Sequence, residues 1–439
     1  MIRNTAPARS SRPGAGRIPS AGPDLAGRDL AVDGVRVFCV LMVVIAHLLM
    51  VGVGIDATGA LVISKPLTEL AWFPVATWFG QVMPLFFVLG GFASLTAWRS
   101  LRRRGGTAAD YVRTRVVRLV RPTIPLFAAL AGAIGIALVA GVPGGLVAGV
   151  AQGVGTPLWF LAAYLLCQWC VPLLARLHER APVRTLVALA GAALIVDAVR
   201  TATGIDVIGL VNVLFVWLFV QQLGFLYADG VFLRAPRLLL GGIAAAAVVL
   251  LAAGVAAGMY APDMLTNQYP PRFALGLLGV AQICVLALIH PALSAVMRTR
   301  AARAVTFLVG SRLMTVYLWH LPCIIVVTGV ALLLPLPVPS PGSAAWWGTR
   351  PLVLLVALTL VFALSLVVGR FERTPARAGT IPPRARRVNA AALIATVPPF
   401  LIMCLGLDGA LAMLGLVSGL AALALCRDGR AVDAAAVEA

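Results

Sequence analysis

The chain has 439 residues, of which 61% are hydrophobic and only 12% are charged. Soluble domains carry about 25% charged residues, so this composition excludes a water-exposed globular surface and makes the lipid bilayer the solvent. The net charge of +19 would indicate a nucleic-acid partner in a soluble protein. In a membrane protein its meaning depends on where the charges lie along the chain, and no nucleic-acid partner is predicted.

Apolar runs long enough to cross a bilayer recur along the whole chain, from Gly34 to Cys426. About 20 apolar residues in a helix span the ~30 Å hydrocarbon core, so helices are the expected element. We therefore expect an all-α fold, a polytopic transmembrane bundle of about 10–12 spans. The predicted spans in chain order are 34–55, 74–98, 121–142, 157–177, 184–202, 206–228, 236–259, 272–296, 311–335, 350–369, 388–406 and 408–426.

Basic residues are distributed unevenly between the two sides that these spans define. With the N-terminus placed in the cytosol, 31 of the 35 Lys and Arg residues fall in inner segments. The outer segments keep four, which are Lys65, Arg200, Arg272 and Arg350. Because cytosolic loops carry the excess of positive charge, this asymmetry predicts two cytosolic termini and a multi-pass protein of the plasma membrane.

Composition also predicts how the chain is organised. The first residues are rich in Arg, Pro, Gly, Ser and Ala and contain almost no large apolar side chain, which is typical of disorder. The predicted units are a disordered cytosolic tail at 1–29, a membrane domain of about ten spans at 30–387, a helical hairpin at 388–426 and a cytosolic tail at 427–439. Pro398 and Pro399 are expected to interrupt the first helix of the hairpin.

The cysteines do not indicate a metal centre. None of the seven falls in a predicted outer loop, so no disulfide framework is expected. Cys167 and Cys170 have a CxxC spacing, but they lie within an apolar span and no second pair accompanies them. We interpret them as helix-packing residues and predict no metal.

The first span contains the most informative pair of polar residues. Ten residues separate Arg36 from His47. At about 100° per residue, eleven steps return to within roughly 20° of the starting direction, so both side chains lie on one face of the helix. The helical rise over this interval is ~16 Å, which places Arg36 at the cytosolic interface and His47 near the middle of the bilayer.

A histidine at that depth is a candidate general base. An ionisable residue inside a membrane is costly and usually faces a cavity or a partner, and histidine titrates near neutral pH. The alternative is that His47 only hydrogen-bonds a neighbouring helix, and Arg36 alone is typical of arginines that snorkel to the interface. Together on one face, the two residues favour an anion-binding group at the membrane surface with a base deeper in the bundle.

A second cluster of positive charge follows the second span. Eight arginines lie between Arg99 and Arg121, and topology alone accounts for about half of them. Arg115 and Arg118 are three residues apart, so they share a helix face that leads into the third span. The rigid fork of guanidinium donors on this face is suited to binding phosphate groups.

Several motifs in this order resemble those of the acyltransferase 3 family of integral membrane acyltransferases. They are Asp33-Gly34 before Arg36 and His47, Pro84-Leu-Phe-Phe-Val-Leu-Gly-Gly91-Phe92, the RxxR pair before Pro122, Leu158-Trp159-Phe-Leu161 with Pro172 thirteen residues after the Trp, and Tyr317-Leu-Trp-His320-Leu-Pro322. The resemblance covers about 34–370.

This resemblance implies a function and a set of site residues. Family members transfer acyl groups, often acetyl, from cytosolic acyl-coenzyme A to hydroxyls of sugars or sugar-bearing products. It implies His47 as the catalytic base and Arg36, Arg115 and Arg118 as ligands of the coenzyme A phosphates. We therefore predict a membrane O-acyltransferase with acyl-CoA as donor and a glycan, glycolipid or secondary metabolite as acceptor. Direct transfer and an acyl-enzyme route both stay open.

Two positions depart from the family pattern. Gly90-Gly91-Phe92 stands where many members have Ser-Gly-Phe, and Tyr164 stands where a Glu follows the Trp by five residues. We expect these changes to bear on the shape of the acceptor site. Asp33, Trp159 and Tyr164 are accordingly further candidate site residues.

His320 and Asp197 are the other ionisable groups expected at membrane depth. His320 lies eight residues after Arg312 and about 12 Å into its span, so it either shares the cavity of His47 or packs against its neighbours. Asp197 lies three residues before Arg200 inside the fifth span, which favours an internal ion pair over catalysis.

A transporter or flippase of a small polar or lipid-linked solute is the alternative function. Twelve spans with buried Asp197 and His47 are compatible with it. Binding of acyl-CoA that depends on Arg115 and Arg118 distinguishes the two classes, because a transporter of unrelated solutes has no reason to bind it.

Overall fold

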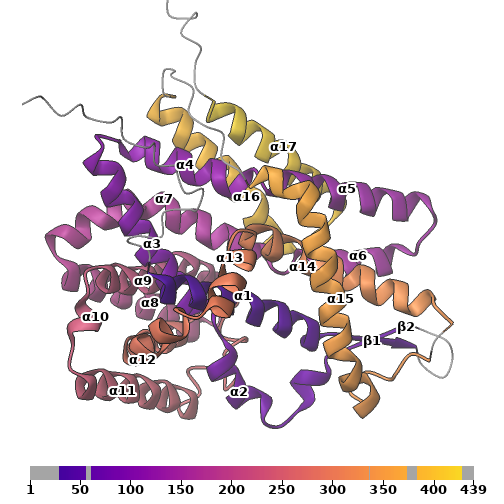
Figure 1. Cartoon of the computed structure of the whole chain (residues 1–439), viewed down its shortest axis with the longest axis horizontal. Helices are drawn as coiled ribbons and strands as arrows, with labels where there is room; N and C mark the ends of the chain where they lie inside the picture. Colours follow the sequence, from indigo (N-terminus) through magenta and orange to yellow (C-terminus); the bar gives the residue numbers. More distant parts are fainter. Residues whose placement is uncertain (1–28, 56–60, 336, 373–382, 428–439) are drawn as a thin grey trace, which may run out of the picture.

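The computed structural model describes residues 29–55, 61–335, 337–372 and 383–427, and these form a bundle of helices with one small two-stranded sheet (Figure 1). The α-helices are α1 Leu30–Met50, α2 Phe73–Gly80, α3 Met83–Arg103, α4 Ala108–Val120, α5 Thr123–Val139, α6 Gly144–Gly155, α7 Leu158–Arg180, α8 Pro182–Thr203, α9 Asn212–Ala228, α10 Val231–Arg234, α11 Arg237–Ala256, α12 Ala274–Val296, α13 Arg300–Gly310, α14 Leu313–Leu333, α15 Ala344–Val368, α16 Ala385–Leu405 and α17 Gly409–Leu425. Strands β1 Gly52–Ile55 and β2 Leu61–Ser64 pair antiparallel, and short 3-10 helices occupy Pro66–Glu69, Asp206–Val211 and Gly369–Phe371.

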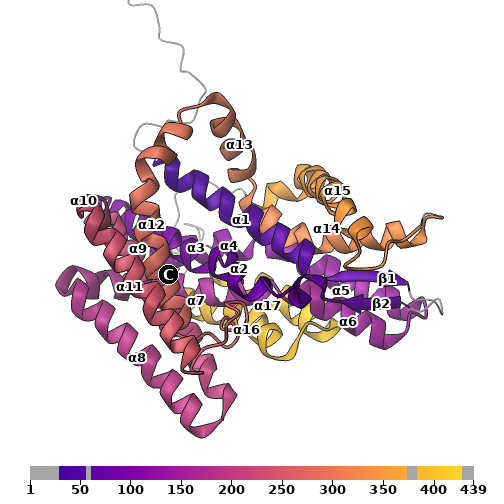
Figure 2. The same cartoon turned by 90° about the horizontal axis from the view of Figure 1, so that it is seen from below.

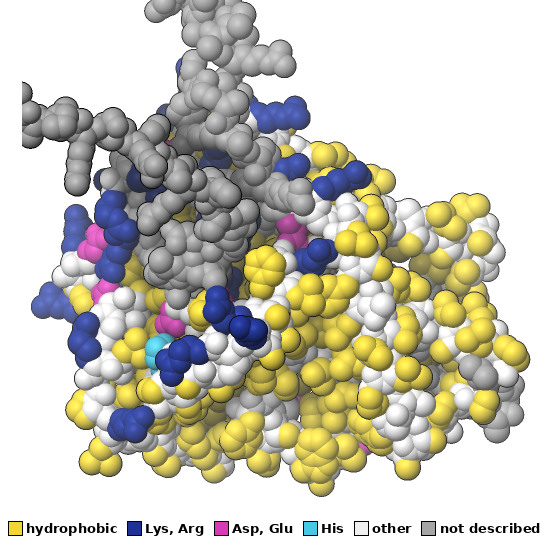
Figure 3. All heavy atoms as spheres, viewed as in Figure 1, with side chains coloured by type: hydrophobic (Ala, Val, Ile, Leu, Met, Phe, Trp, Pro, Cys, Tyr) yellow, Lys and Arg dark blue, Asp and Glu magenta, His cyan; other side chains and the backbone are white. Residues whose placement is uncertain are grey.

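The predicted all-α polytopic architecture is confirmed. Within the described residues, eleven helical segments are long and apolar enough to cross a membrane, and α17, with 17 residues, is the shorter twelfth. Val139, Leu238 and Leu333 are 86–91% exposed, which suits side chains that face lipid. Lys and Arg side chains gather toward one end of the face in Figure 3, and hydrophobic side chains cover much of the remainder.

One prediction about helix continuity is wrong. Pro398 and Pro399 do not interrupt α16, which is helical throughout Ala385–Leu405. Proline is tolerated inside transmembrane helices because neighbouring groups compensate for the lost backbone hydrogen bond. The structure also has a helix that the sequence analysis did not predict: α6 lies between the third and fourth predicted spans, although it has five glycines. The weak helix propensity of glycine is overridden where no water competes for the backbone.

α6 and α7 together form a broken helix. The apolar segment Gly144–Arg180 has 37 residues, too many for one straight span, and Thr156 and Pro157 separate the two parts. Pro157 lacks a backbone N–H and therefore cannot continue the hydrogen bonding of α6. The break lies beside α14, because the hydroxyl of Tyr317 donates to the carbonyl of Pro157 at 2.6 Å.

α1 lies inside the bundle, where it contacts α3, α12, α13, α14 and α15 (Figure 2). Its start is fixed by Asp29, whose Oδ1 accepts from the backbone N–H groups of Ala31 at 3.0 Å and Val32 at 3.3 Å. Oδ2 of the same carboxylate lies 3.1 Å from Nε2 of His290 on α12. The N-terminus of α1 is thus joined to a second helix. The remainder of the predicted N-terminal tail, 1–28, and 428–439 of the C-terminal tail lie outside the described residues.

Asp197 and Arg200 form other bonds than the predicted ion pair. Asp197 accepts from Asn212 Nδ2 at 2.9 Å and from the backbone N–H of Phe273 at 2.8 Å. Arg200 pairs with Asp206 at 2.8 Å, because the turn after α8 brings that residue back toward the helix end. Asp197 therefore has a structural role, linking α8, α9 and the start of α12.

The tightest helix packing joins α3 to α9. A Cβ atom on Gly224 would lie 2.0 Å from the carbonyl oxygen of Val88, and one on Gly91 would lie 2.2 Å from that of Gln221. Both neighbours are backbone atoms, which cannot move aside as a flexible side chain does. The two glycines therefore set the distance between α3 and α9, as small residues do at helix interfaces in membranes.

We expect Gly224→Ala to lower the free energy of unfolding by about 1–3 kcal/mol, the usual cost of an overpacked interior. Gly132→Ala on α5 is the control, because a Cβ at Gly132 would meet nothing within 4 Å. Thermal unfolding of both variants in detergent, followed by circular dichroism, measures the difference. Equal unfolding temperatures for the two variants would contradict the packing argument.

Candidate active site

A cavity of about 2970 Å³ lies among α1, α3, α4, α6, α7, α13, α14 and α16. All eight candidate site residues from the sequence line this cavity: Asp33, Arg36, His47, Arg115, Arg118, Trp159, Tyr164 and His320. Arg36 and His47 both face it from α1, as their spacing predicted. The fold therefore brings residues from both ends of the predicted membrane domain to one place.

The arginine pair is positioned by the start of α4. Thr107 and Asp110 form a capping box that begins this helix directly after the turn at 104–106. The guanidinium of Arg115 lies over the ring of Tyr111, 4.9 Å from its centre. Tyr111 in turn donates to Gln168 Oε1 on α7 at 2.9 Å, so the platform beneath Arg115 is itself fixed.

The cavity is also lined by charged residues that belong to none of the sequence motifs. Glu372 accepts from the backbone N–H of Thr315 at 2.5 Å and from its hydroxyl, at the start of α14. Burial raises the pKa of the Glu372 carboxyl, and the bonds from Thr315 and the charges of Arg118 and Arg312 oppose that change. Arg303 and Arg370 also line the cavity.

We call Arg36, Arg115, Arg118, Arg312 and Glu372 the arginine-rich mouth. Arg118 lies within electrostatic reach of Arg36 and Arg115, and Glu372 lies within reach of Arg118 and Arg312. Arg312 also donates to the hydroxyl of Ser365 on α15. From the sequence alone, Arg312 is one of many positive charges on the predicted inner side. Nothing in its local sequence distinguishes an arginine that lines a cavity from one that only sets the membrane topology.

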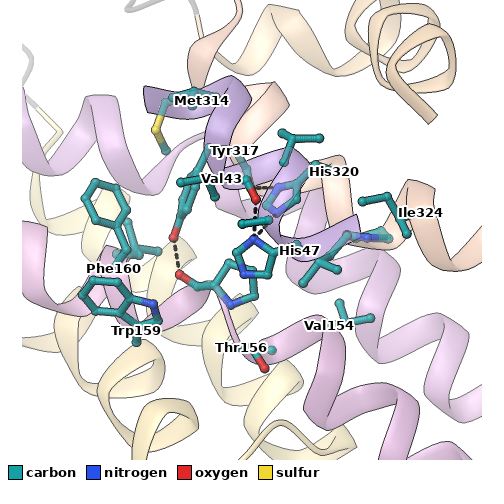
Figure 4. A pocket seen from close by; sticks show the side chains of 18 of the residues that line it. Val43, His47, Val154, Thr156, Trp159, Phe160, Met314, Tyr317, His320 and Ile324 are labelled. Atoms are coloured by element: carbon teal, nitrogen blue, oxygen red, sulfur yellow. Dashed lines mark hydrogen bonds between the residues drawn. The ribbon is translucent and has the colours of Figure 1, made fainter. Parts of the chain in front are cut away.

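His47 and His320 form a pair deeper in the cavity (Figure 4). Their ring centres are 5.0 Å apart, and Nε2 of His320 lies 3.4 Å from Nδ1 of His47. His47 Nδ1 also lies 2.8 Å from the carbonyl oxygen of Val43, one helical turn earlier. The two alternatives for His320 both hold, since it lines the cavity and is also packed, with 1% of its surface exposed.

The two departures from the family pattern touch one another. A Cβ at Gly90 would lie 3.0 Å from Cε2 of Tyr164 and 3.3 Å from its hydroxyl oxygen. The Tyr164 ring stacks on Phe160, with 5.3 Å between ring centres. Glycine at position 90 thus leaves room for the ring of Tyr164, and Tyr164 itself lines the cavity.

These features define an integral membrane protein whose helix bundle encloses a largely apolar cavity with several arginines and two histidines in its wall. A family model described as an acyltransferase domain matches residues 29–370. The chain belongs to this family, acyltransferase 3, and is a membrane acyltransferase. Comparisons with curated proteins and with solved structures give no significant match.

Part of the cavity wall comes from residues beyond this match. The end of α16 and the turn that follows line it with Ile402, Met403, Cys404, Leu405, Gly406 and Leu407. This turn packs on the end of α6, where a Cβ at Gly155 would lie 2.5 Å from Cβ of Leu407. The C-terminal hairpin is therefore part of the site as well as of the fold.

The Gly90–Tyr164 contact predicts non-additive effects on stability. Gly90→Ala presses on the Tyr164 ring, so it should cost less free energy of unfolding when Tyr164 is already Ala. We expect a coupling of about 0.5–1 kcal/mol in a double-mutant cycle of Gly90→Ala and Tyr164→Ala, measured by thermal unfolding.

The matched control combines Gly90→Ala with Leu238→Ala. Leu238 is 90% exposed on α11 and does not line the cavity, so this pair should be additive. Additivity in both cycles would show that Gly90 and Tyr164 act independently.

Proposed function

We propose that this protein transfers an acyl group, acetyl or another short acyl, from cytosolic acyl-CoA to a hydroxyl of a carbohydrate, glycosylated or lipid acceptor. The observation that carries the proposal is that a single cavity includes both the arginine-rich mouth and His47. The excess of positive charge on the proposed inner side supports a cytosolic mouth and a plasma-membrane location. O-acetylation of a cell-envelope carbohydrate is one reaction of the proposed kind.

The mouth is suited to the nucleotide end of coenzyme A. That end carries several negative charges on phosphate groups, and guanidinium groups bind phosphate through paired hydrogen bonds. Arg36, Arg115 and Arg118 are the proposed ligands. The helical rise between Arg36 and His47 is ~16 Å, a distance that the extended pantetheine arm of the coenzyme is long enough to cross.

His47 is the proposed general base. It takes the proton of the acceptor hydroxyl while the hydroxyl oxygen attacks the thioester carbonyl. The new carbon–oxygen bond forms, the carbon–sulfur bond breaks, and the leaving thiolate takes the proton back from His47. We favour this direct transfer over an acyl-enzyme route, in which His47 would first carry the acyl group itself. The route uses no metal ion.

The acceptor would occupy the part of the cavity that lies away from the mouth. Trp159 of α7 lines the cavity, and so do apolar residues of α16, whereas Tyr164 lies within electrostatic reach of Arg115 and Arg118 at the mouth. Aromatic rings beside a few hydrogen-bonding groups suit a sugar or another amphipathic molecule. Because Gly90 and Tyr164 contact each other, we expect this pocket to differ in shape from the pocket of family members that have Ser and Glu at these two positions.

Removal of the mouth arginines should weaken donor binding. We expect Arg115→Ala and Arg118→Ala each to raise the dissociation constant of acetyl-CoA by about 10-fold or more, since a charged hydrogen bond contributes roughly 1.5–3 kcal/mol. Calorimetry with protein in lipid nanodiscs measures it. Arg237→Ala is the control, because Arg237 is exposed at the start of α11 and does not line the cavity. Equal affinity in all three variants would refute the assignment.

Removal of the base should separate catalysis from binding. We expect His47→Ala to lower acyl transfer by about 100- to 10,000-fold, the usual contribution of general base catalysis, and to leave the affinity for acetyl-CoA unchanged. Transfer of label from radioactive acetyl-CoA in native membranes, which contain the acceptor, measures the rate. Undiminished transfer would exclude His47 as the base.

A further inference from the structure

The backbone carbonyls of two helices determine which nitrogen of each cavity histidine carries the proton. A carbonyl oxygen can only accept a hydrogen bond, so a ring nitrogen that faces one must be the N–H. Nδ1 of His47 faces the carbonyl of Val43 at 2.8 Å. Nδ1 of His320 faces the carbonyls of Tyr317 at 2.7 Å and Val316 at 3.2 Å. Both neutral rings are therefore Nδ1–H tautomers.

This assignment gives the contact between the rings a direction. With its proton on Nδ1, His320 has a lone pair on Nε2, and that lone pair faces Nδ1–H of His47 across 3.4 Å. His47 Nδ1–H is shared between Val43 and His320, and the lone pair of His47 lies on Nε2. Long hydrogen bonds of this kind in substrate-free sites shorten when the reacting complex forms.

We propose that His320 is a positioning residue for His47: it accepts a hydrogen bond from Nδ1–H, holds the ring so that Nε2 is the basic nitrogen, and stabilises the imidazolium formed when Nε2 takes the hydroxyl proton. The inference rests on the proposed function, in which His47 is the base. His320 does not touch the reacting atoms in this scheme. The proton taken by Nε2 goes to the leaving thiolate, and Nδ1 keeps its own proton throughout.

The depth of the pair explains why such a partner is needed. A positive charge formed at membrane depth is costly, and hydrogen-bond acceptors within the protein lower that cost. Carboxylates commonly orient catalytic histidines. Among the described residues, the acidic side chains that line the cavity are Asp33, close to Arg36 along α1, and Glu372, beside Arg118 and Arg312. Neither is hydrogen-bonded to His47, whose partners are Val43 and His320.

The surroundings of His320 hold its ring in the accepting orientation. The ring is 1% exposed and its Nδ1 is tied to its own helix. Tyr317, one turn earlier, donates its hydroxyl to the carbonyl of Pro157 at 2.6 Å, which joins α14 to the break between α6 and α7 (Figure 4). His320 therefore cannot turn to offer an N–H toward His47 without losing the bonds to Tyr317 and Val316.

Substitutions of matched size test the hydrogen-bonding role. His320→Leu fills the space without an acceptor, whereas His320→Gln offers an amide oxygen in its place. We expect the Leu variant to lower kcat by about 10- to 100-fold with an unchanged dissociation constant for acetyl-CoA, and the Gln variant to recover most of that loss. Cys323→Ala, a buried position on α14 that does not line the cavity, controls for packing and should keep full activity.

Nitrogen NMR of the wild-type protein tests the tautomers without any substitution. The chain has four histidines, so 15N-histidine spectra in nanodiscs can be assigned from single variants. A protonated Nδ1 and an unprotonated Nε2 are expected for both His47 and His320 in their neutral forms. An Nε2–H tautomer at His320, or equal kcat for the Leu and Gln variants, would overturn the inference. Full transfer by His47→Ala would refute the assignment of His47 as the base, on which this inference rests, whereas full transfer by His320→Leu with an inactive His47→Ala would refute only the role of His320.

Discussion

Every polar group at membrane depth must find its partner within the protein, and this constraint organises the structure. Gln168 on α7 illustrates it, because its amide exchanges hydrogen bonds with Ser94 on α3 and accepts from Tyr111 on α4. Asp197 similarly links α8, α9 and α12. Each buried polar group thus fixes the relative positions of several helices.

The same constraint accounts for the geometry of the histidine pair. His47 and His320 each satisfy Nδ1 with a carbonyl of their own helix, one turn earlier. This local bond determines the tautomer, and it leaves the two Nε2 atoms as acceptors whose environment depends on packing. The contact between the rings then follows from the packing of α1 against α14 and of α14 against the break at Pro157. Helix assembly, rather than a flexible loop, sets the distance between the histidines.

The sequence predicted the parts of the site that depend on one helix. Arg36 and His47 share a face because helical periodicity is a local property, and Arg115 with Arg118 follows the same logic. The contact of His47 with His320 joins residues 273 positions apart, and periodicity contains no information on such pairs. The roles of Glu372 and Arg312 at the mouth, and the contact of Gly90 with Tyr164, were missed for the same reason.

Some of the residues that line the cavity lie inside the region matched by the family model, and others lie outside it. The cavity arginines and histidines lie within residues 29–370, the matched region, so the proposed donor site and the proposed base belong to the shared part. The wall at Ile402–Leu407 lies outside it, and the turn there presses on α6 next to the break that holds Tyr317. A change in this turn would alter the space offered to an acceptor and, through Pro157 and Tyr317, the support of His320. The C-terminal hairpin therefore connects the proposed acceptor side of the cavity to the histidine pair, although no residue of the hairpin takes part in the proposed chemistry.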